Sequence, residues 1–305
     1  MKNILVATDK PFAKVASDQI KNIIEEAGYV CNFLEKYPNQ DALIAGVGEA
    51  DAIIIRSDII DKAVLEAAKN LKIVVRAGAG YDNVDLASAT EKGVVVMNTP
   101  GQNSNAVAEL ALGMMVYQLR NHFNGSSGTE LFGKKLGIHA YGNVGKHVAR
   151  IAKGFGMEVY AFDPFVSKEI IEKDGVIPVG SINELYGTCQ FVSLHIPANA
   201  QTKKSVNFEL LSLMPAQSML VNTARKEVIC EEGLKRIFSE KKGFTYVSDV
   251  APDNLADLSE YAERMFVTPK KMGAQTAEAN INAGIAAAQQ IIAFFKHDDI
   301  TFKVN

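Results

Sequence analysis

Residues 136–164 read LGIHAYGNVGKHVARIAKGFGMEVYAFDP. The pattern predicts an apolar strand, a tight turn at Gly142 and Gly145, an amphipathic helix, and a second strand that ends at Asp163. In such a βαβ unit the glycines admit a pyrophosphate and close helix packing, and the helix N-terminus holds the negative charge. Ala140 stands at the first glycine position, so the motif is A-x-G-x-x-G.

Asp163 extends this interpretation to the choice of cofactor. An acidic residue at the end of the second strand accepts hydrogen bonds from a ribose 2′-OH and repels a 2′-phosphate. The sequence therefore predicts NAD rather than NADP. A glycine-containing turn of another α/β protein is the alternative, but strand, helix, second strand and acid in register argue against it.

Composition limits the class of protein. A chain of 305 residues with 48% hydrophobic content has room for two domains with separate cores. A net charge of −3 argues against general nucleic-acid binding. No apolar run approaches a membrane span of about 20 residues, and no signal peptide is recognisable at residues 1–10. Cys31, Cys189 and Cys230 fit no disulfide or metal spacing, so we expect a cytoplasmic protein with reduced thiols, no metal site, and no nucleic-acid or membrane partner.

Strands and helices alternate along the whole chain. The strands before residue 98 are apolar, and residues 53–55 wholly so, which predicts a parallel sheet covered on both faces. A long apolar helix over residues 104–120 is expected to cross between two domains. The later elements are predicted as strands over 191–197, 219–224, 245–250 and 265–269, helices over 231–242 and 277–295, and a short terminal strand over 300–305.

The predicted fold is α/β, with two Rossmann-like or flavodoxin-like doubly wound parallel-sheet domains and a cleft between them. Residues 1–98 and 283–305 are expected to form a discontinuous substrate-binding domain. Residues 99–282 are expected to form the NAD-binding Rossmann domain.

Nearly the whole chain resembles the D-2-hydroxyacid dehydrogenases. The similar stretches are IIRSDIIDKAVLEAA (54–68), IVVRAGAGYDNVDLASATEKGVVVMNTPGQNSNAVAEL (73–110), GTELFGKKLGIHAYGNVG (128–145), VNTARKEVI (221–229) and TPKKMGAQTAEA (268–279). Within the family the chain is most similar to short members that oxidise 3-phospho-D-glycerate to 3-phosphohydroxypyruvate with NAD, the first step of phosphorylated serine biosynthesis. The resemblance also implies a homodimer joined through the NAD domains and no appended regulatory serine-binding module.

Two cations are the candidate catalytic residues. Arg225, in NTARKE, matches the position of the family's catalytic arginine, and a guanidinium binds a carboxylate at two points. The family's histidine is absent from TPKKMG. Counting back from Gly273 places Lys271 in the histidine slot, whereas counting forward from Pro269 places Lys270 there; we choose Lys271, because the pattern continues unbroken from Gly273.

The glutamate that partners the histidine is also missing, and Asn254 stands at its position. A lysine already holds its proton at neutral pH, so it needs its pKa lowered, by burial and by the charges of Arg225 and Arg76. We expect Lys271 to take the hydroxyl proton in oxidation and to return it in reduction. There are two alternatives. The adjacent lysines could be a solvated surface pair, and the loss of the histidine and the glutamate could equally mark an enzyme that has lost its activity. Whether Asp253 replaces the glutamate is left open.

The substrate phosphate needs cations from the first domain. Arg56 and Arg76 follow two apolar strands, so both are expected at the carboxyl edge of the sheet. Arg56 has an alternative role as a surface ion-pair partner. The glycine-rich loop Ala77, Gly78, Ala79 and Gly80 is expected to receive the substrate carboxylate through its N–H groups.

The cofactor is expected to contact the strand-end loops and the fingerprint turn. For His195 and for the nearby His139 a structural role in the core is the alternative. The full set of predicted cofactor contacts is Asn105, Tyr141, Gly142, Asn143, Val144, Gly145, Asp163, Pro164, His195, Ile196, Pro197, Thr202, Thr223, Ala224, Asp249, Gly273 and Ala274, with Asp249 on the nicotinamide carboxamide as the resemblance implies.

Two other functions remain open. A glyoxylate or hydroxypyruvate reductase shares the fold and the arginine but has no need for a phosphate site. A non-catalytic NAD-binding scaffold would explain the missing histidine and glutamate. The first is distinguished by its substrates and the second by NADH binding without turnover.

Overall fold

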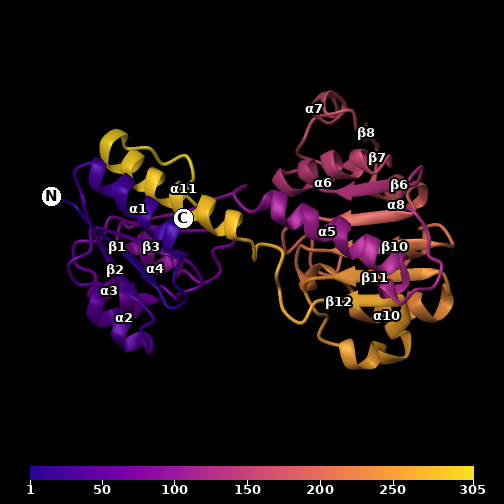
Figure 1. Cartoon of the computed structure of the whole chain (residues 1–305), viewed down its shortest axis with the longest axis horizontal. Coiled ribbons are helices and arrows are strands. Elements are labelled where there is room, and N and C mark those ends of the chain that lie inside the picture. Colours follow the sequence, from indigo (N-terminus) through magenta and orange to yellow (C-terminus); the bar gives the residue numbers. More distant parts are fainter. The chain divides into compact units, whose positions relative to one another are not determined.

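The computed structural model describes residues 1–305 and divides into two compact units (Figure 1). Unit 1 comprises Met1–Asn103 and Gln275–Asn305, and unit 2 comprises Ser104–Ala274. These boundaries differ from the predicted 98/99 and 282/283. The second differs because α11 (Ala277–His297) is one continuous helix that packs on unit 1 along α1, β3 and β4.

Unit 1 is built on a five-stranded parallel sheet in the order β2-β1-β3-β4-β5, the flavodoxin-like order. Its strands are β1 (Asn3–Thr8), β2 (Val30–Glu35), β3 (Ala52–Ile55), β4 (Ile73–Arg76) and β5 (Val95–Asn98). Its helices are α1 (Lys14–Glu26), α2 (Gln40–Gly46), α3 (Lys62–Ala67), α4 (Leu86–Glu91) and α11.

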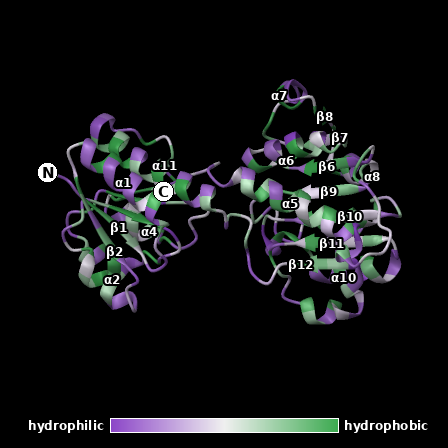
Figure 2. Ribbon diagram, viewed as in Figure 1, coloured by the Kyte–Doolittle hydropathy of each residue, from purple (hydrophilic) through white to green (hydrophobic).

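Both faces of this sheet are buried, as the apolar strands predicted. Alternate residues of one strand enter different cores: Ile54 packs on the side of α1 and α11, and Ile53 and Ile55 pack on the side of α2, α3 and α4. Figure 2 shows the strands as predominantly hydrophobic and the helices with mixed faces. Side-chain oxygens of Asn39, Asp61 and Asp85 accept the capping hydrogen bonds that start α2, α3 and α4.

The predicted terminal strand over residues 300–305 is wrong. Lys303 makes only an isolated antiparallel bridge with Met97. The amide of Val96, on the free edge of β5, donates to the side-chain oxygen of Asn305 at 2.8 Å and not to a backbone carbonyl of the tail. The tail therefore covers the edge of β5 with one bridge and a side chain, which blocks the edge without adding a strand.

Unit 2 is built on a seven-stranded parallel sheet in the order β12-β11-β10-β9-β6-β7-β8. Its strands are β6 (Lys135–His139), β7 (Glu158–Phe162), β8 (Ile177–Pro178), β9 (Phe191–Leu194), β10 (Ser218–Asn222), β11 (Phe244–Ser248) and β12 (Met265–Val267). Its helices are α5 (Ser104–Leu119), α6 (Asn143–Gly154), α7 (Lys168–Lys173), α8 (Ile182–Thr188), α9 (Phe208–Ser212) and α10 (Glu231–Glu240), with 3₁₀ segments η1 (Asn121–Phe123), η2 (Lys226–Val228) and η3 (Leu255–Arg264).

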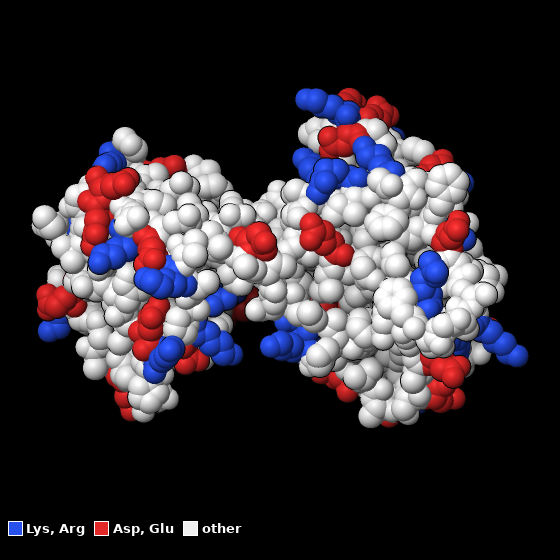
Figure 3. Space-filling model, viewed as in Figure 1, with Lys and Arg blue, Asp and Glu red and all other residues white.

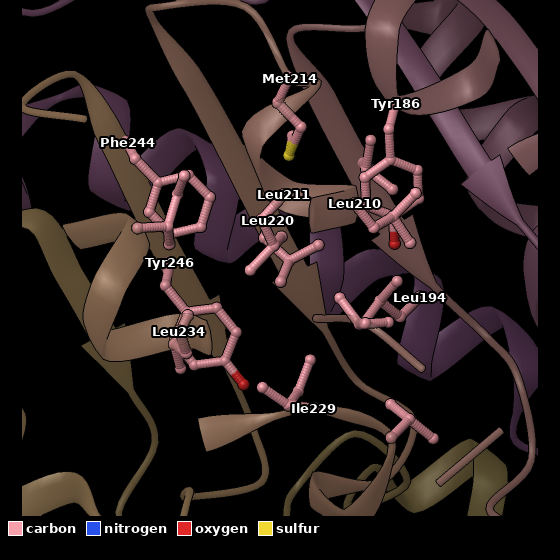
Figure 4. Close-up of a cluster of buried hydrophobic side chains, with 14 of the residues drawn as sticks. Tyr186, Leu194, Leu210, Leu211, Met214, Leu220, Ile229, Leu234, Phe244 and Tyr246 are labelled. Carbon is pink, nitrogen blue, oxygen red and sulfur yellow. The ribbon is translucent and has the colours of Figure 1, made fainter. Parts of the chain in front are cut away.

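The strand order reverses between β6 and β9, and dinucleotides bind doubly wound sheets at this kind of switch point. α5 and α6 cover one face of the sheet, so α5 is part of unit 2 and not the connection between domains that its length predicted. On the other face, Tyr186, Leu210, Leu211 and Leu234 pack against Leu220 and Tyr246 (Figure 4).

Acidic and basic side chains are interspersed on the visible surface of each unit (Figure 3). The three cysteines are unpaired thiols, of which Cys31 and Cys189 are buried. No helix combines the length and the apolar character that crossing a bilayer requires.

Candidate active site

Most of the predicted site residues of unit 2 follow the carboxyl ends of its parallel strands, which meet at one edge of the sheet. The strands β9 to β12 end earlier than predicted, so these residues lie on the loops that follow the strands, apart from Asn143, Val144 and Gly145, which begin α6. The residues concerned are Tyr141–Gly145 after β6, Asp163 and Pro164 after β7, His195, Ile196, Pro197 and Thr202 after β9, Thr223, Ala224 and Arg225 after β10, Asp249 after β11, and Lys271, Gly273 and Ala274 after β12.

The two glycines of the fingerprint turn meet different requirements. A Cβ on Gly145 would lie 2.5 Å from the carbonyl oxygen of Ala140, so the helix packs on the strand only with glycine there. A Cβ on Gly142 would meet no protein atom within 4 Å, and its φ of −84° suits any residue. The space above Gly142 is therefore free for a ligand. Ala140 has a φ of +83°, a left-handed conformation that favours glycine.

The N-terminus of α6 points its first amides away from the helix. Gly142 is the N-cap and contributes no capping side chain; the first intrahelical bond runs from Lys146 N to Gly142 O, at 3.0 Å. The amides of Asn143, Val144 and Gly145 precede that bond, so an anion at this end finds three donors and the positive end of the helix dipole.

Asp163 lies beside this turn with its carboxylate fixed by backbone amides. Its Oδ2 accepts from Tyr141 N and its Oδ1 from Phe165 N, each at 2.8 Å. A carboxylate has further lone pairs for a ribose hydroxyl. The Tyr141 side chain, by contrast, is buried and donates to Asp174 Oδ2 at 3.0 Å, so Tyr141 supports Asp163 through its backbone and offers no side chain to a cofactor.

Two predicted contacts are engaged with neighbouring protein groups. Asn105, on the first turn of α5, donates to Glu109 and accepts from Arg150 on α6. The Thr202 hydroxyl donates to Pro197 O at 2.5 Å and closes the loop after β9. Both side chains are therefore engaged in hydrogen bonds within unit 2.

His139 and His195 form a neutral pair at the ends of β6 and β9. His195 N donates to His139 O at 2.9 Å, and the His195 Nε2 is buried without a protein partner. Burial lowers the pKa of His139 to about 4 and that of His195 to about 3. The His139 ring lies edge-on to Tyr186, and its Nδ1 is 3.3 Å from that hydroxyl. Both residues keep some exposure, and His195 Nε2 lacks the hydrogen bond that a satisfied structural histidine would make.

These histidines predict a loss of stability in acid. An unfolded histidine has a pKa near 6.5, so below that pH the unfolded chain binds protons that the folded chain refuses, and the free energy of unfolding falls as the pH drops toward about 4. We expect a loss of about 2 kcal/mol or more for the pair between about pH 6.5 and pH 5. Denaturant unfolding at each pH measures it, and His195→Asn should flatten the slope. His297→Gln, at the exposed end of α11, is the control; equal slopes for both variants would contradict the assignment.

Arg225 and Lys271 converge on one backbone oxygen. Arg225 Nη1 donates to Ala224 O at 2.9 Å, and Lys271 Nζ donates to the same oxygen at 3.3 Å. Lys270 has an exposed side chain, and its carbonyl accepts from the Thr268 hydroxyl. Of the two lysines that the sequence left as alternatives, Lys271 is thus the one beside the arginine. Arg225 is half-buried, whereas Lys271 is exposed and not buried as the sequence led us to expect.

Asn222 holds the arginine loop and was not predicted as a site residue. It is fully buried; its Nδ2 donates to Arg225 O and its Oδ1 accepts from Ala224 N, both at 3.0 Å. Asp249 N donates to Asn222 O at 3.2 Å, which links the ends of β10 and β11. A polar residue closing the apolar run SMLVN was the only sequence signal for this role.

Asp249 is almost completely buried beside these cations. Its Oδ2 accepts from Gly273 N at 2.7 Å, while its Oδ1 is buried with no hydrogen-bond partner. Burial raises the pKa of Asp249, against the lowering effects of the Gly273 amide and the charges of Lys271 and Arg225. A buried acceptor without a donor is rare in proteins, and an amide donor of a bound cofactor would satisfy it. The Thr223 hydroxyl is likewise buried and unpartnered.

Asp253 does not take the place of the missing glutamate. Its Oδ1 pairs with Lys226 Nζ at 2.5 Å, and its side chain is 73% exposed. Asn254 donates to Glu231 O at 3.3 Å. Asp249 is therefore the carboxylate that interacts with the Lys271 segment, although it was predicted only as a cofactor contact.

In unit 1 the two arginines have different surroundings. The Arg56 guanidinium donates to Lys10 O, Pro11 O and Asn280 Oδ1, and burial lowers its pKa. These bonds tie the loop after β1 to α11, so Arg56 is engaged in bracing unit 1. Arg76 Nε donates to Arg56 O at 3.0 Å.

The loop after β4 offers fewer amides than predicted. Ala77 N donates to Ile55 O and Gly78 N to Arg76 O, both at 2.8 Å, so two of the four amides are used. The amides of Ala79 and Gly80 donate to no protein acceptor. The Arg76 guanidinium lies where a Cβ on Gly78 would be, only 1.5 Å from its Nη1, and Gly78 has a φ of +154°. Glycine is therefore required here for the arginine to lie over the loop.

Nearly the whole chain is similar to known proteins. Residues 6–305 match the family model described as "D-isomer specific 2-hydroxyacid dehydrogenase, catalytic domain". A D-3-phosphoglycerate dehydrogenase of Methanocaldococcus jannaschii is 34% identical over 290 residues, 90% of this chain and 55% of that protein. A hydroxypyruvate reductase of Thermotoga maritima is 34% identical over 310 residues, 95% of this chain and 98% of that protein.

A solved structure is more similar still. The NAD⁺-bound 3-phosphoglycerate dehydrogenase of Entamoeba histolytica shares 45% identity with a TM-score of 0.89, covering 100% of this chain and 98% of that one. The chain spans about half the length of most of the curated phosphoglycerate dehydrogenases that it matches. With the family model matched from residue 6 to residue 305, the chain belongs to the D-isomer specific 2-hydroxyacid dehydrogenases.

Proposed function

We propose that the protein is an NAD-dependent dehydrogenase that oxidises 3-phospho-D-glycerate to 3-phosphohydroxypyruvate, the first step of phosphorylated serine biosynthesis. The observation that carries this proposal is the pairing of Arg225 and Lys271 on Ala224 O, beside the unpartnered oxygen of Asp249. Similarity to phosphoglycerate dehydrogenases, including one solved with NAD⁺, supports the substrate and the cofactor.

The residues present fit NAD. The free space above Gly142, the amides of Asn143 and Val144 and the carboxylate of Asp163 match a pyrophosphate and a ribose diol. The unpartnered Oδ1 of Asp249 matches the nicotinamide carboxamide. When bound there, NAD⁺ supplies the acceptor for the hydride from C2 of the substrate.

Arg225 and Lys271 divide the remaining chemistry. The guanidinium binds the substrate carboxylate and polarises the oxygen on C2, because it stays charged throughout the reaction. Lys271 Nζ accepts the C2 hydroxyl proton as the carbonyl forms and returns it in reduction. For this the lysine must lose a proton before the substrate hydroxyl is oxidised.

In unit 1 we assign the phosphate to Arg76, and the amides of Ala79 and Gly80 are further donors for the substrate, in addition to Arg225 for its carboxylate. Arg56 is assigned to bracing, since its guanidinium already binds Lys10 O, Pro11 O and Asn280. A single phosphate arginine favours the second candidate function, reduction of hydroxypyruvate, as does the Thermotoga maritima relative that the chain covers almost completely.

A substrate panel decides between these functions. NADH oxidation is measured at neutral pH with 3-phosphohydroxypyruvate, hydroxypyruvate and glyoxylate, with NADPH as the cofactor control. We expect the phosphorylated ketoacid with NADH to give the highest kcat/KM, by about tenfold or more, because a phosphate ion pair is lost with the others. Higher kcat/KM with hydroxypyruvate would establish the reductase, and NADH binding without any turnover would establish the scaffold.

For the assembly we propose a homodimer through unit 2, located in the cytoplasm. Unit 2 exposes large apolar side chains at Phe123 and Phe132, 65% and 74% accessible, and exposed aromatic side chains are common at interfaces. The unpaired thiols fit a reducing compartment. Light scattering coupled to gel filtration measures the mass directly, and a monomer at micromolar concentration would refute the dimer.

A further inference from the structure

The segment that carries Lys271 has no regular secondary structure. It follows β12 and runs from Thr268 to Ala274, where unit 2 ends. Three hydrogen bonds involve side chains: Lys271 Nζ donates to Ala224 O, the Thr268 hydroxyl donates to Lys270 O at 2.8 Å, and Gly273 N donates to Asp249 Oδ2 at 2.7 Å. The third bond is buried and joins the segment to the end of the neighbouring strand β11.

The contact between Asp249 and the segment is tight. A Cβ on Gly273 would lie 2.8 Å from Asp249 Oδ2, so the amide reaches the carboxylate only because residue 273 is glycine. Asp249 itself is 1% exposed and is held by its own amide on Asn222 O. The carboxylate is thus a fixed point of the sheet edge, and the loop is fastened to it two residues after Lys271.

Charge complements this attachment. A buried carboxylate is costly unless nearby donors or cations compensate it. Burial raises the pKa of Asp249, and the Gly273 amide and the charges of Lys271 and Arg225 act against this by favouring the ionised form. Lys271, whose Nζ donates to Ala224 O, is thus one of the two cations that offset the buried charge of Asp249.

We propose, on the basis of the dehydrogenase function proposed above, that Asp249 is the positioning residue for Lys271. Its Oδ2 anchors the segment through Gly273 N, and this attachment keeps the lysine beside Arg225. Asp249 thus orients the lysine as a partner glutamate orients a histidine, but it does so mainly through a hydrogen bond to the backbone of the segment. A carboxylate directly on the ammonium would hold the proton too strongly for a base.

A double-mutant cycle of Asp249→Ala and Lys271→Ala tests this at saturating NAD⁺. If Asp249 acts through Lys271, Asp249→Ala lowers kcat by about 30-fold alone but by less than about threefold when Lys271 is already alanine. Asp249→Asn keeps an oxygen for Gly273 N and should recover most of the loss. Asp253→Ala, an exposed aspartate four residues further on, is the control and should stay within about twofold. Equal losses in both backgrounds would overturn the proposal.

Hydrogen–deuterium exchange provides a readout that needs no turnover. Peptides covering residues 268–274 should exchange about tenfold faster in Asp249→Ala and at the wild-type rate in Asp249→Asn and Asp253→Ala. Unchanged exchange in Asp249→Ala would refute the anchoring even in an active enzyme. Faster exchange in Asp249→Ala, combined with a wild-type protein that turns over none of the ketoacids, would keep the anchoring but refute the dehydrogenase function, and with it the catalytic part of the proposal.

Discussion

Lys271→Ala is expected to lower kcat by about 10²–10⁴-fold in either direction, because a positioned acid or base contributes that range. The lysine is the one side chain of TPKKMG whose Nζ reaches the oxygen that Arg225 also binds. Steady-state kinetics with 3-phosphohydroxypyruvate and NADH measures the loss. The affinity for NADH, measured by its fluorescence, should stay within about threefold, since no cofactor contact is removed.

Lys270→Ala is the matched control. Lys270 is adjacent, carries the same charge and is exposed, but contributes only its carbonyl to the local hydrogen bonds. It should retain kcat within about twofold. If Lys270→Ala lost as much activity as Lys271→Ala, the register chosen from Gly273 would be wrong. If neither lost activity, the proton acceptor would have to be another group.

Exchanging either fingerprint glycine for alanine should separate a packing requirement from a ligand requirement. Gly145→Ala places a methyl 2.5 Å from Ala140 O and 3.0 Å from the Ile138 side chain, so the helix must move. We expect it to destabilise unit 2 by about 2 kcal/mol or more. Gly142→Ala meets no protein atom within 4 Å and should change the free energy of unfolding by less than about 0.5 kcal/mol.

For cofactor binding we expect the larger effect from Gly142→Ala and not from Gly145→Ala. The methyl of Gly142→Ala occupies the space proposed for the pyrophosphate and should weaken NADH binding by about 10-fold to 100-fold in a folded protein. Thermal unfolding and NADH fluorescence titration measure the two effects separately. A Gly142→Ala protein that binds NADH normally would show that the space above the turn is not used by the cofactor.

The local patterns of the sequence predicted most of the fold. Apolar strands such as residues 53–55 are buried on both faces, and the fingerprint turn, its helix and Asp163 lie as the motif indicated. Strand ends were less predictable, because apolar residues continue past the last paired residue, as Ile196 does beyond Leu194. The tail was misread for a similar reason: its alternation suits a strand, but one side chain, Asn305, takes the place of a strand pairing.

Side-chain partners distant in sequence could not be predicted. From the sequence, Arg56 was predicted as a phosphate ligand at the end of a strand. In the structure its guanidinium binds Asn280, 224 residues away, and so connects β3 to α11. Tyr141 sits in the fingerprint, yet its ring enters the core to reach Asp174. The bond from Asp249 to Gly273 likewise depends on the packing of β11 beside β12.

The two units differ in how they are encoded along the gene. Unit 2 is encoded by one uninterrupted stretch that contains Arg225, Asp249 and Lys271, whereas unit 1 is assembled from two separated stretches. One recombination cassette with two junctions would therefore transplant the fingerprint turn and both candidate catalytic cations together. On the proposed assignment of the substrate phosphate to Arg76, a point substitution in unit 1 would alter substrate preference without disturbing that cassette, so chemistry and selectivity would evolve as separate modules.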